Sequence, residues 1–359
     1  MDEVTYPPME NLMGLDLRLL AGRPPRYDPD FVLENAVAFK ASEGLPAALR
    51  GIKPMRPLKE AVVVLALLLV FLAPVAVLAL PLVAYFSPTA ALALGAPMAA
   101  SVLAPARHWP ACQTAWFASW VLEYFSTVLV WDARFDPERY FERSALLYTV
   151  PHGVMPVGSM LAHLVVERVF GFEAHGYAAS VVFRLPLARQ LIAWMGGIPA
   201  DRAAIRAVLR RPREGSGGFL DGIAGMFEGG PGREVFFLGR RTGAFRLALE
   251  HGVALLGGYC FGTTDVMSCW HDRRTGVMRA LSRALRASIL VPIGRWGLPI
   301  PRRVPLLLVY ADVLAPARDE APTDEAVLAL RAEFLGRVRC AFETGKHLYG
   351  WGDRELVIK

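Results

Sequence analysis

The sequence predicts an α/β protein: a mixed sheet flanked by helices, with an N-terminal membrane hairpin. From about residue 132 to residue 359, short β-type runs alternate with helical runs, which indicates one domain built around a mixed sheet. Residues 61–106 contain no Asp, Glu, Lys or Arg, and about 20 apolar residues suffice to cross a bilayer core. We therefore expect a polar N-terminal region (1–58), a transmembrane or re-entrant hairpin (59–106) and a globular domain (107–359).

The elements of the globular domain follow from the periodicity of their apolar residues and from the Gly, Pro and polar residues at their ends. Polar, proline-rich sequence before the hairpin predicts only short helices, such as Phe31–Ser42, and the glycine-rich run Arg213–Gly218 predicts a flexible loop. The expected strands are Ala145–Val150, Val235–Leu238, Leu255–Phe261 and Leu306–Val313, and the expected helices are Gly158–Val169, Thr242–His251 and Asp324–Lys346.

Composition narrows the classes of function. Hydrophobic residues make up 54% of the chain and the mean hydropathy is +0.35, which is high for a soluble protein. The net charge of +6 is typical of proteins that bind nucleic acid, an anionic membrane surface or a phosphorylated substrate. Beside a long apolar segment the last two are favoured, so we expect no nucleic-acid partner. The four cysteines lack C-x-x-C spacing, so neither a zinc site, a redox motif nor a disulfide framework is indicated.

The uncharged segment is flanked by basic residues, with Lys53, Arg56 and Lys59 before it and Arg107 after it. By the positive-inside tendency both flanks face the cytosol, which leaves two short spans or a re-entrant hairpin open. A buried helix pair fits the length of the uncharged run poorly. The aromatic stretch Trp109–Trp131 indicates an interfacial helix, with packing in the core as a nearly equal alternative.

The tripeptide Pro151-His152-Gly153 stands where a β-type run turns into a helical run. Proline fixes the backbone before the imidazole and glycine lets the chain pass it. Catalytic side chains are often presented from such turns. Taken alone, however, the tripeptide favours a simple turn with a partly buried histidine over a catalytic site.

Other signals are weaker. Arg202, Arg206 and Arg210 would form one basic stripe on a helix, and a second basic run spans residues 273–286. Each run is explained equally well as a phosphate-binding site or as a helix face that is exposed to solvent. Thr242 is a candidate N-cap, and the following helix start with Arg241 would suit an anion. P-loop, dinucleotide, nucleophile-elbow and zinc-peptidase motifs do not occur. Histidines 108, 163, 175 and 271 lack acids at ligand spacing, so no metal site is predicted.

Six segments carry a resemblance. In chain order they are Val150-Pro151-His152-Gly153, Phe183-Arg184-Leu185-Pro186, Trp194-Met195-Gly196-Gly197-Ile198-Pro199-Ala200-Asp201-Arg202, Gly229-Gly230-Pro231-Gly232-Arg233-Glu234, Arg241-Thr242-Gly243-Ala244-Phe245 and Tyr259-Cys260-Phe261-Gly262. Together with the apolar hairpin they resemble the diacylglycerol acyltransferase 2 family, which includes monoacylglycerol and wax-ester acyltransferases. The resemblance covers roughly residues 60–350. The chain departs from the family pattern at Val150, where the family has a first motif histidine, at Ala244, and by one extra residue before Glu234.

The resemblance implies an acyl-CoA-dependent O-acyltransferase that makes triacylglycerol from diacylglycerol, with acyl-CoA as co-substrate and no other cofactor or metal. It implies that His152 is the general base, that Gly153, Gly229, Gly230 and Glu234 support the oxyanion or its loops, and that Arg184, Arg241, Gly243 and Phe245 bind substrate. It further implies an endoplasmic reticulum membrane protein whose catalytic domain faces the cytosol, with lipid droplets as a second location. Acyl-chain preference and homo-oligomer formation stay open.

Three other readings remain. Monoacylglycerol or a wax alcohol would serve as acceptor with the same chemistry. A lysophospholipid acyltransferase would need Asp at the position of Val157, which counts against it. A non-catalytic lipid-binding or scaffold protein derived from the family is favoured by Val150 alone.

Overall fold

A mixed sheet forms the centre of the computed structural model, which describes residues 16–20, 37–132, 140, 142–170, 172–272, 275–285 and 288–359. Its strands are β1 (Asp16–Leu20), β2 (Val37–Lys40), β3 (Val128–Asp132), β4 (Ala145–Val150), β5 (Glu173–Ala178), β6 (Ile198–Pro199), β7 (Glu214–Gly218), β9 (Ala254–Phe261) and β12 (Leu307–Leu314). Within the described residues their order is β2-β1-β3-β12-β9-β4-β7-β5-β6. Two small sheets pair β8 (Glu234–Phe236) with β13 (Leu356–Ile358) and β10 (Ser268–Trp270) with β11 (Val291–Ile293).

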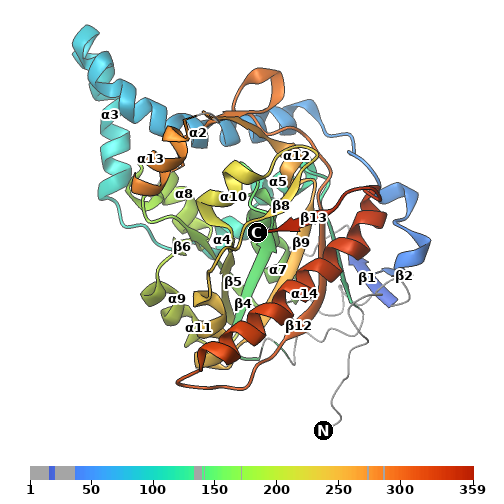
Figure 1. Ribbon diagram of the computed structural model, residues 1–359. Coiled ribbons are helices and arrows are strands. Elements are labelled where there is room, and N and C mark those ends of the chain that lie inside the picture. Colours follow the sequence, from blue (N-terminus) through green and yellow to red (C-terminus); the bar gives the residue numbers. More distant parts are fainter. Residues whose placement is uncertain are drawn as a thin grey trace.

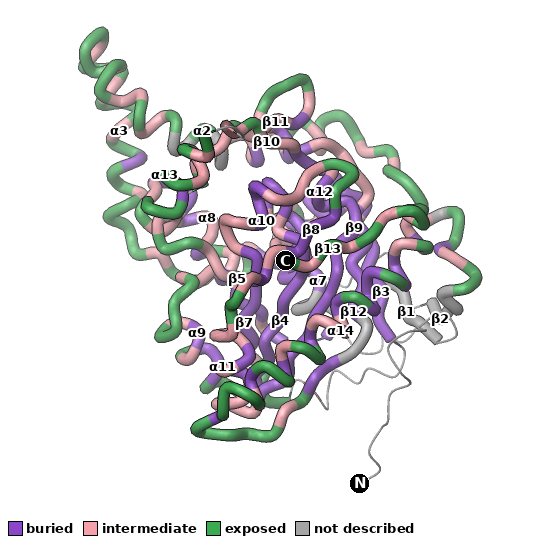
Figure 2. The backbone as a smooth tube through the Cα atoms, viewed as in Figure 1, coloured by how far each residue is buried: buried purple, intermediate pink, exposed green. Residues whose placement is uncertain are grey.

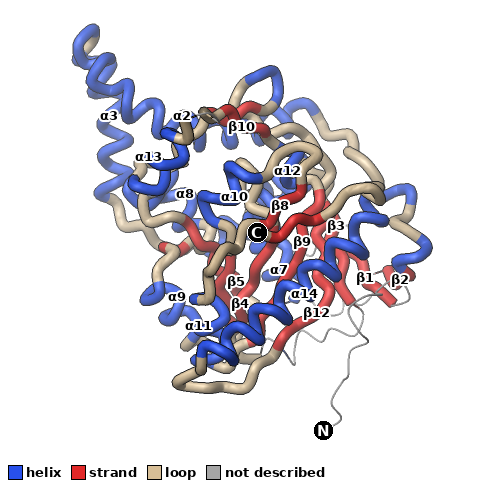
Figure 3. The backbone as a smooth tube through the Cα atoms, viewed as in Figure 1, coloured by secondary structure: helices blue, strands red, loops and turns tan. Residues whose placement is uncertain are grey.

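Helices cover both faces of the sheet (Figure 1). The α-helices of the described residues are α2 (Pro57–Phe86), α3 (Pro88–Leu103), α4 (Pro110–Thr114), α5 (Trp116–Tyr124), α7 (Val157–Phe170), α8 (Ala188–Trp194), α9 (Arg202–Leu209), α10 (Gly222–Glu228), α11 (Gly243–His251), α12 (Thr263–Val266), α13 (Val277–Leu285) and α14 (Asp324–Tyr349). The long helix α14 packs on β9 and β12, while α7 packs on β4 and β5. Figure 3 shows α14 in front of the strands and α7 behind them.

Strand β4 shows why the sequence forms a central strand. All six of its residues are buried, as expected of a parallel strand covered on both faces. Ala145 and Leu147 lie in the core beneath α5 and α7, whereas Leu146, Tyr148 and Val150 lie in the core beneath α11 and α14. Figure 2 shows β4 and β9 in purple, the colour of buried residues, at the centre of the molecule.

The direction of the strands determines where the loops meet. Strand β4 is parallel to both β9 and β7, and β7 is parallel to β5. On the other side, β12 is antiparallel to β9 and parallel to β3. The carboxyl ends of β4, β7 and β9 therefore lie at one edge of the sheet, and ligands of open α/β sheets bind beyond such an edge.

The uncharged segment folds as the helix pair α2 and α3, which meet at Ser87, the N-cap of α3. The two helices pack on each other. The first half of α2 also packs on α5, with Val63 and Leu67 buried in the core, and only the far ends of the pair project from the domain (Figure 1). Large apolar side chains along them are exposed, including Leu78 at 81% and Tyr85 at 82%. Among the described residues, no helix has both the length and the apolar character that crossing a membrane requires.

Three expectations about local structure were wrong. Within Phe31–Ser42, residues 31–36 lie outside the described part, and Val37–Lys40 is strand β2, paired with β1, instead of helix. Instead of one interfacial helix, Trp109–Trp131 contains α4, α5 and most of β3; Tyr124, Phe125 and Trp131 are buried in the core, whereas Trp109 and Trp116 are exposed.

The third concerns Arg213–Gly218, which is not a flexible loop but contains the buried strand β7. Its glycines are required by close neighbours: a Cβ on Gly217 would lie 1.8 Å from the carbonyl oxygen of Leu147, and one on Gly215 would lie 1.8 Å from the ring of Phe172. Glycine inside a strand often marks such a close approach of another backbone or side chain. The glycine-rich composition of this segment is what led to the incorrect prediction of a loop.

Candidate active site at three strand ends

The loops after β4, β7 and β9 bring three residues to one place. His152 follows β4 after a cis Val150–Pro151 bond, Asp221 follows β7, and Thr263 begins α12 after β9. Gly153 has φ +64°, and a Cβ on it would lie 2.9 Å from Cγ2 and 3.0 Å from the carbonyl oxygen of Thr263. This tight contact fixes the backbone beside the imidazole.

The contacts of His152 define its ring. Its backbone N–H donates to Oδ2 of Asp221 over 2.8 Å, and its Nδ1 lies 2.8 Å from the carbonyl oxygen of Gly153. Because a carbonyl oxygen only accepts, Nδ1 carries the hydrogen of the neutral ring and Nε2 carries the lone pair. The ring packs on Phe219 with centroids 4.4 Å apart. The half-buried imidazole is thus held in the tautomer that a general base needs at Nε2.

Asp221 is fully buried, and sequence reasoning missed it. Its Oδ1 has no hydrogen-bond partner among the described residues. Burial raises the pKa of the Asp221 carboxyl, while His152 and Arg241 oppose that rise. The signal that would have found it is a polar residue directly after a strand adjacent to β4, but β7 itself was not recognised.

Arg241 and Gly243 lie beside this loop. The Arg241 guanidinium donates to the carbonyl oxygens of Leu220 over 3.1 Å and Phe237 over 3.0 Å, so it ties the loop before α11 to the Asp221 loop. Gly243 is the first residue of α11, as predicted, and Thr242 is its N-cap, but the threonine side chain makes no capping hydrogen bond.

Glu234 lies at the start of β8 and is buried. It accepts hydrogen bonds from Tyr259 over 2.6 Å, from Thr264 over 2.9 Å and from Arg354 over 2.8 Å. Burial raises the pKa of Glu234, and these three donors oppose the rise. Since Thr264 belongs to α12, Glu234 holds the helix whose first residue contacts Gly153. Gly229 and Gly230 form the preceding turn, where Gly230 pairs with Arg233.

Two predicted substrate-binding residues lie elsewhere. Phe245 is fully buried in the core, with its ring centroid 5.4 Å from that of Phe334. Arg184 is exposed on a short 3-10 helix, Val182–Arg184. In the part of the chain that the structure describes, no hydrogen bond or ring contact joins either residue to His152. Both assignments stay predictions.

The basic runs are partly neutralised. Arg206 pairs with Glu250 at 2.7 Å and Arg279 pairs with Glu228 at 3.1 Å. Arg202 and Arg210 are exposed. The described part of each run is therefore explained at least as well by a solvent-exposed basic face as by a phosphate-binding site.

Comparison with known proteins decides the family. A family model described as diacylglycerol acyltransferase matches residues 103–359. The chain belongs to this family. Membership makes it an acyltransferase of neutral-lipid synthesis, and it is a divergent member. No solved structure matches the chain.

The relatives in this family differ in their named acceptors. The chain is 25% identical to diacylglycerol O-acyltransferase 2-like protein 6 of Bos taurus, covering 68% of this chain and 80% of the relative. It is 26% identical to acyl-CoA wax alcohol acyltransferase 2 of Mus musculus (66% and 75%) and 24% identical to 2-acylglycerol O-acyltransferase 1 of Bos taurus (68% and 78%). The three relatives are thus named for different acceptors.

Proposed function

We propose that this acyltransferase transfers the acyl group of acyl-CoA to the hydroxyl of diacylglycerol, forming triacylglycerol and CoA, with His152 as general base. The observation that carries the proposal is the His152 ring itself. Its Nδ1 is bound to the Gly153 carbonyl oxygen, so Nε2 presents a lone pair at the carboxyl edge of the sheet.

The chemistry needs few groups. Nε2 of His152 takes the hydroxyl proton while the acceptor oxygen attacks the thioester carbon, and the imidazolium then returns that proton to the departing CoA sulfur. A thioester is already activated, so no serine or cysteine nucleophile is required. Backbone N–H groups near Gly153 or in the turn 229–232 would stabilise the oxyanion. Arg184 and Arg241, both exposed, would bind the phosphates of CoA.

A bilayer is the source of both lipidic substrates in this proposal. The apolar side chains exposed along α2 and α3, such as Leu78 and Tyr85, would lie in lipid and hold the domain on the cytosolic face of the endoplasmic reticulum or on a lipid droplet. Diacylglycerol would then reach the site laterally. Exposed apolar area of this extent is typical of membrane or partner contact.

A direct assay tests the acceptor and the base together. Membranes containing the protein receive labelled oleoyl-CoA with diacylglycerol, monoacylglycerol or a long-chain alcohol, and the products are separated. We expect triacylglycerol as the main product and a loss of about 10²–10⁴-fold in His152→Ala. The matched control is His251→Ala, at the end of α11, which keeps activity. Full activity in His152→Ala excludes the base, and a wild type without any product favours lipid binding without catalysis.

Deletion of residues 61–106 tests the membrane anchor separately. We expect the shortened protein to move from the membrane pellet to the soluble fraction. Retention in the pellet would mean that another part of the chain is the main anchor.

A further inference from the structure

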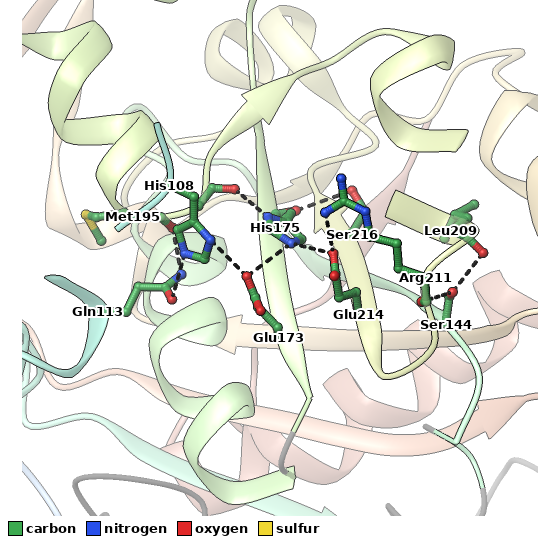
Figure 4. A network of polar contacts seen from close by, with 11 residues as sticks. His108, Gln113, Ser144, Glu173, His175, Met195, Leu209, Arg211, Glu214 and Ser216 are labelled. Carbon is green, nitrogen blue, oxygen red and sulfur yellow. Dashed lines mark hydrogen bonds and ion pairs between the residues drawn. The ribbon is translucent and has the colours of Figure 1, made fainter. Parts of the chain in front are cut away.

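The amino ends of β5 and β7 carry a second polar cluster, at the opposite edge of the sheet from His152. Glu173 and His175 alternate on β5 and so share a face of that strand. Glu214 begins β7, and His108 comes from the segment between α3 and α4 (Figure 4). Ligand atoms of His108, Glu173 and His175 lie within 4.8 Å of one another. None of these residues has a part in the proposed acyl transfer.

The hydrogen bonds of each imidazole indicate which nitrogen carries the hydrogen when the ring is neutral. Nδ1 of His175 lies 2.9 Å from the carbonyl oxygen of Gly196 and therefore donates to it, which leaves Nε2 as the lone-pair nitrogen. The Gln113 amide donates to the Met195 carbonyl oxygen over 2.7 Å, so its own oxygen accepts from Nε2 of His108 over 3.3 Å. In the neutral ring of His108 the lone-pair nitrogen is then Nδ1, whereas in the protonated ring Nδ1 donates to Glu173, a hydrogen bond that lowers the pKa of that carboxyl.

Both lone-pair nitrogens point to one carboxylate. Nδ1 of His108 lies 2.8 Å from Oε1 of Glu173, and Nε2 of His175 lies 3.5 Å from the same oxygen. Nε2 of His175 also lies 3.1 Å from Oε2 of Glu214. With both imidazoles neutral, these lone pairs would face the carboxylate oxygens, so a positive charge is required between them: a proton on His108 supplies it in the hydrogen-bonded state, and a metal ion would supply it in the same place. Ligating histidines characteristically bind a carbonyl or carboxylate through their other nitrogen, as both do here through Gly196 and Gln113.

We propose that His108 Nδ1, Glu173 and His175 Nε2 bind a Zn²⁺ ion. Two imidazoles and a carboxylate are zinc ligands, and tetrahedral coordination with bonds of about 2.0–2.1 Å puts ligand atoms about 3.3 Å apart. The separations of 2.8 and 3.5 Å lie on either side of that spacing. Glu214, now paired with Arg211 at 3.1 Å, is the fourth protein group within reach. Arg211 is mostly exposed, so it can release that carboxylate.

The position of the site indicates a structural role. His108 follows the helix pair α2–α3, while Glu173 and His175 belong to the central sheet. A shared ion would fasten the base of the helix pair to the edge of the catalytic domain. The turn at Gly196, after α8, already packs tightly against this segment. A Cβ on Gly196 would lie 3.0 Å from the Gln113 side chain and 3.2 Å from the His108 ring.

Metal binding is measured on the full-length protein in detergent after chelation and dialysis. Titration with Zn²⁺ should show one equivalent bound and a higher melting temperature, and Co²⁺ should give the visible absorption of a tetrahedral site. Glu173→Gln keeps a hydrogen-bond acceptor but removes the charge, and we expect it to weaken Zn²⁺ binding by more than about 100-fold, beyond the 10–100-fold typical of losing an outer partner.

Two further variants guard the conclusion. His108→Ala changes a partly exposed ligand and should weaken binding similarly even if Glu173→Gln folds poorly. His271→Ala, a histidine that contacts Cys269 instead of this cluster, should bind Zn²⁺ as the wild type does. Substoichiometric uptake by the wild type, or unchanged affinity in folded Glu173→Gln or His108→Ala, would overturn the site and leave a hydrogen-bonded network only.

Discussion

The backbone N–H of His152 donates a 2.8 Å hydrogen bond to Oδ2 of Asp221. The carboxyl therefore holds the loop on which the imidazole stands, without touching its Nε2. We predict that Asp221→Ala lowers kcat by about 10–100-fold, since a misplacement of about 1 Å at an active site has effects of that order. KM for acyl-CoA should change little, and Asp221→Asn, which keeps an accepting oxygen, should recover most activity. Equal losses in both variants would show that the charge matters more than the position.

The raised pKa of Asp221 predicts a dependence of stability on pH. Because burial favours the protonated form, its contribution to folding is complete below the ordinary pKa of 3.8 and is lost as pH rises through the higher pKa of the folded state. Asn does not titrate. The unfolding free energy of the wild type, relative to Asp221→Asn, should therefore fall as pH rises from 3.8 and then become constant. Denaturant unfolding of both proteins over this range tests the sign, and a difference that grows with pH contradicts it.

Gly153→Ala should impair catalysis more than it impairs folding. The new Cβ would lie 3.0 Å from the Thr263 carbonyl oxygen, which is backbone and moves with α12, so the His152 loop has to shift. The matched control is Gly350→Ala, which also has positive φ but nothing within 4 Å of its Cβ. Both variants carry the backbone strain of about 1–2 kcal/mol, and we expect only Gly153→Ala to lose at least about 10-fold in kcat. Equal kcat values in the two variants would show that the contact between Gly153 and Thr263 does not position His152 for catalysis.

The sequence predicted much of the fold because the core strands are continuous apolar runs. Strand Ala145–Val150 is confirmed residue for residue, and the ends of α7, α11 and α14 differ from expectation by at most a few residues. The features that the sequence did not predict depend on contacts between residues that are far apart in the chain. Nothing local indicates that Gly217 faces the Leu147 carbonyl oxygen, so β7 and hence Asp221 were missed. His108 and Glu173 are distant in sequence, which likewise hid their contact.

Arg354→Ala should destabilise the folded protein by about 2 kcal/mol, the range for a hydrogen bond to a charged group. Its guanidinium reaches the buried Glu234 over 2.8 Å, where only 1% of the glutamate side chain is exposed. The control is Arg318→Ala, whose pair with Glu320 is exposed at both ends and is worth about 0–1 kcal/mol. Denaturant midpoints of the two variants provide the comparison. Similar small shifts would mean that Tyr259 and Thr264 alone satisfy Glu234.

Val150→His tests whether the missing motif histidine can simply be restored. Val150 is fully buried in the core beneath α14 and pairs in register with Tyr259 of β9. An imidazole there would lose its hydration without a matched partner, at a cost of about 1–3 kcal/mol. We therefore expect lower stability and no gain in kcat, because the side chain at this position points into the core and not towards the lone pair of His152. A more active and equally stable variant would show that the β4 terminus repacks, and that the first histidine of the family motif acts directly in the reaction.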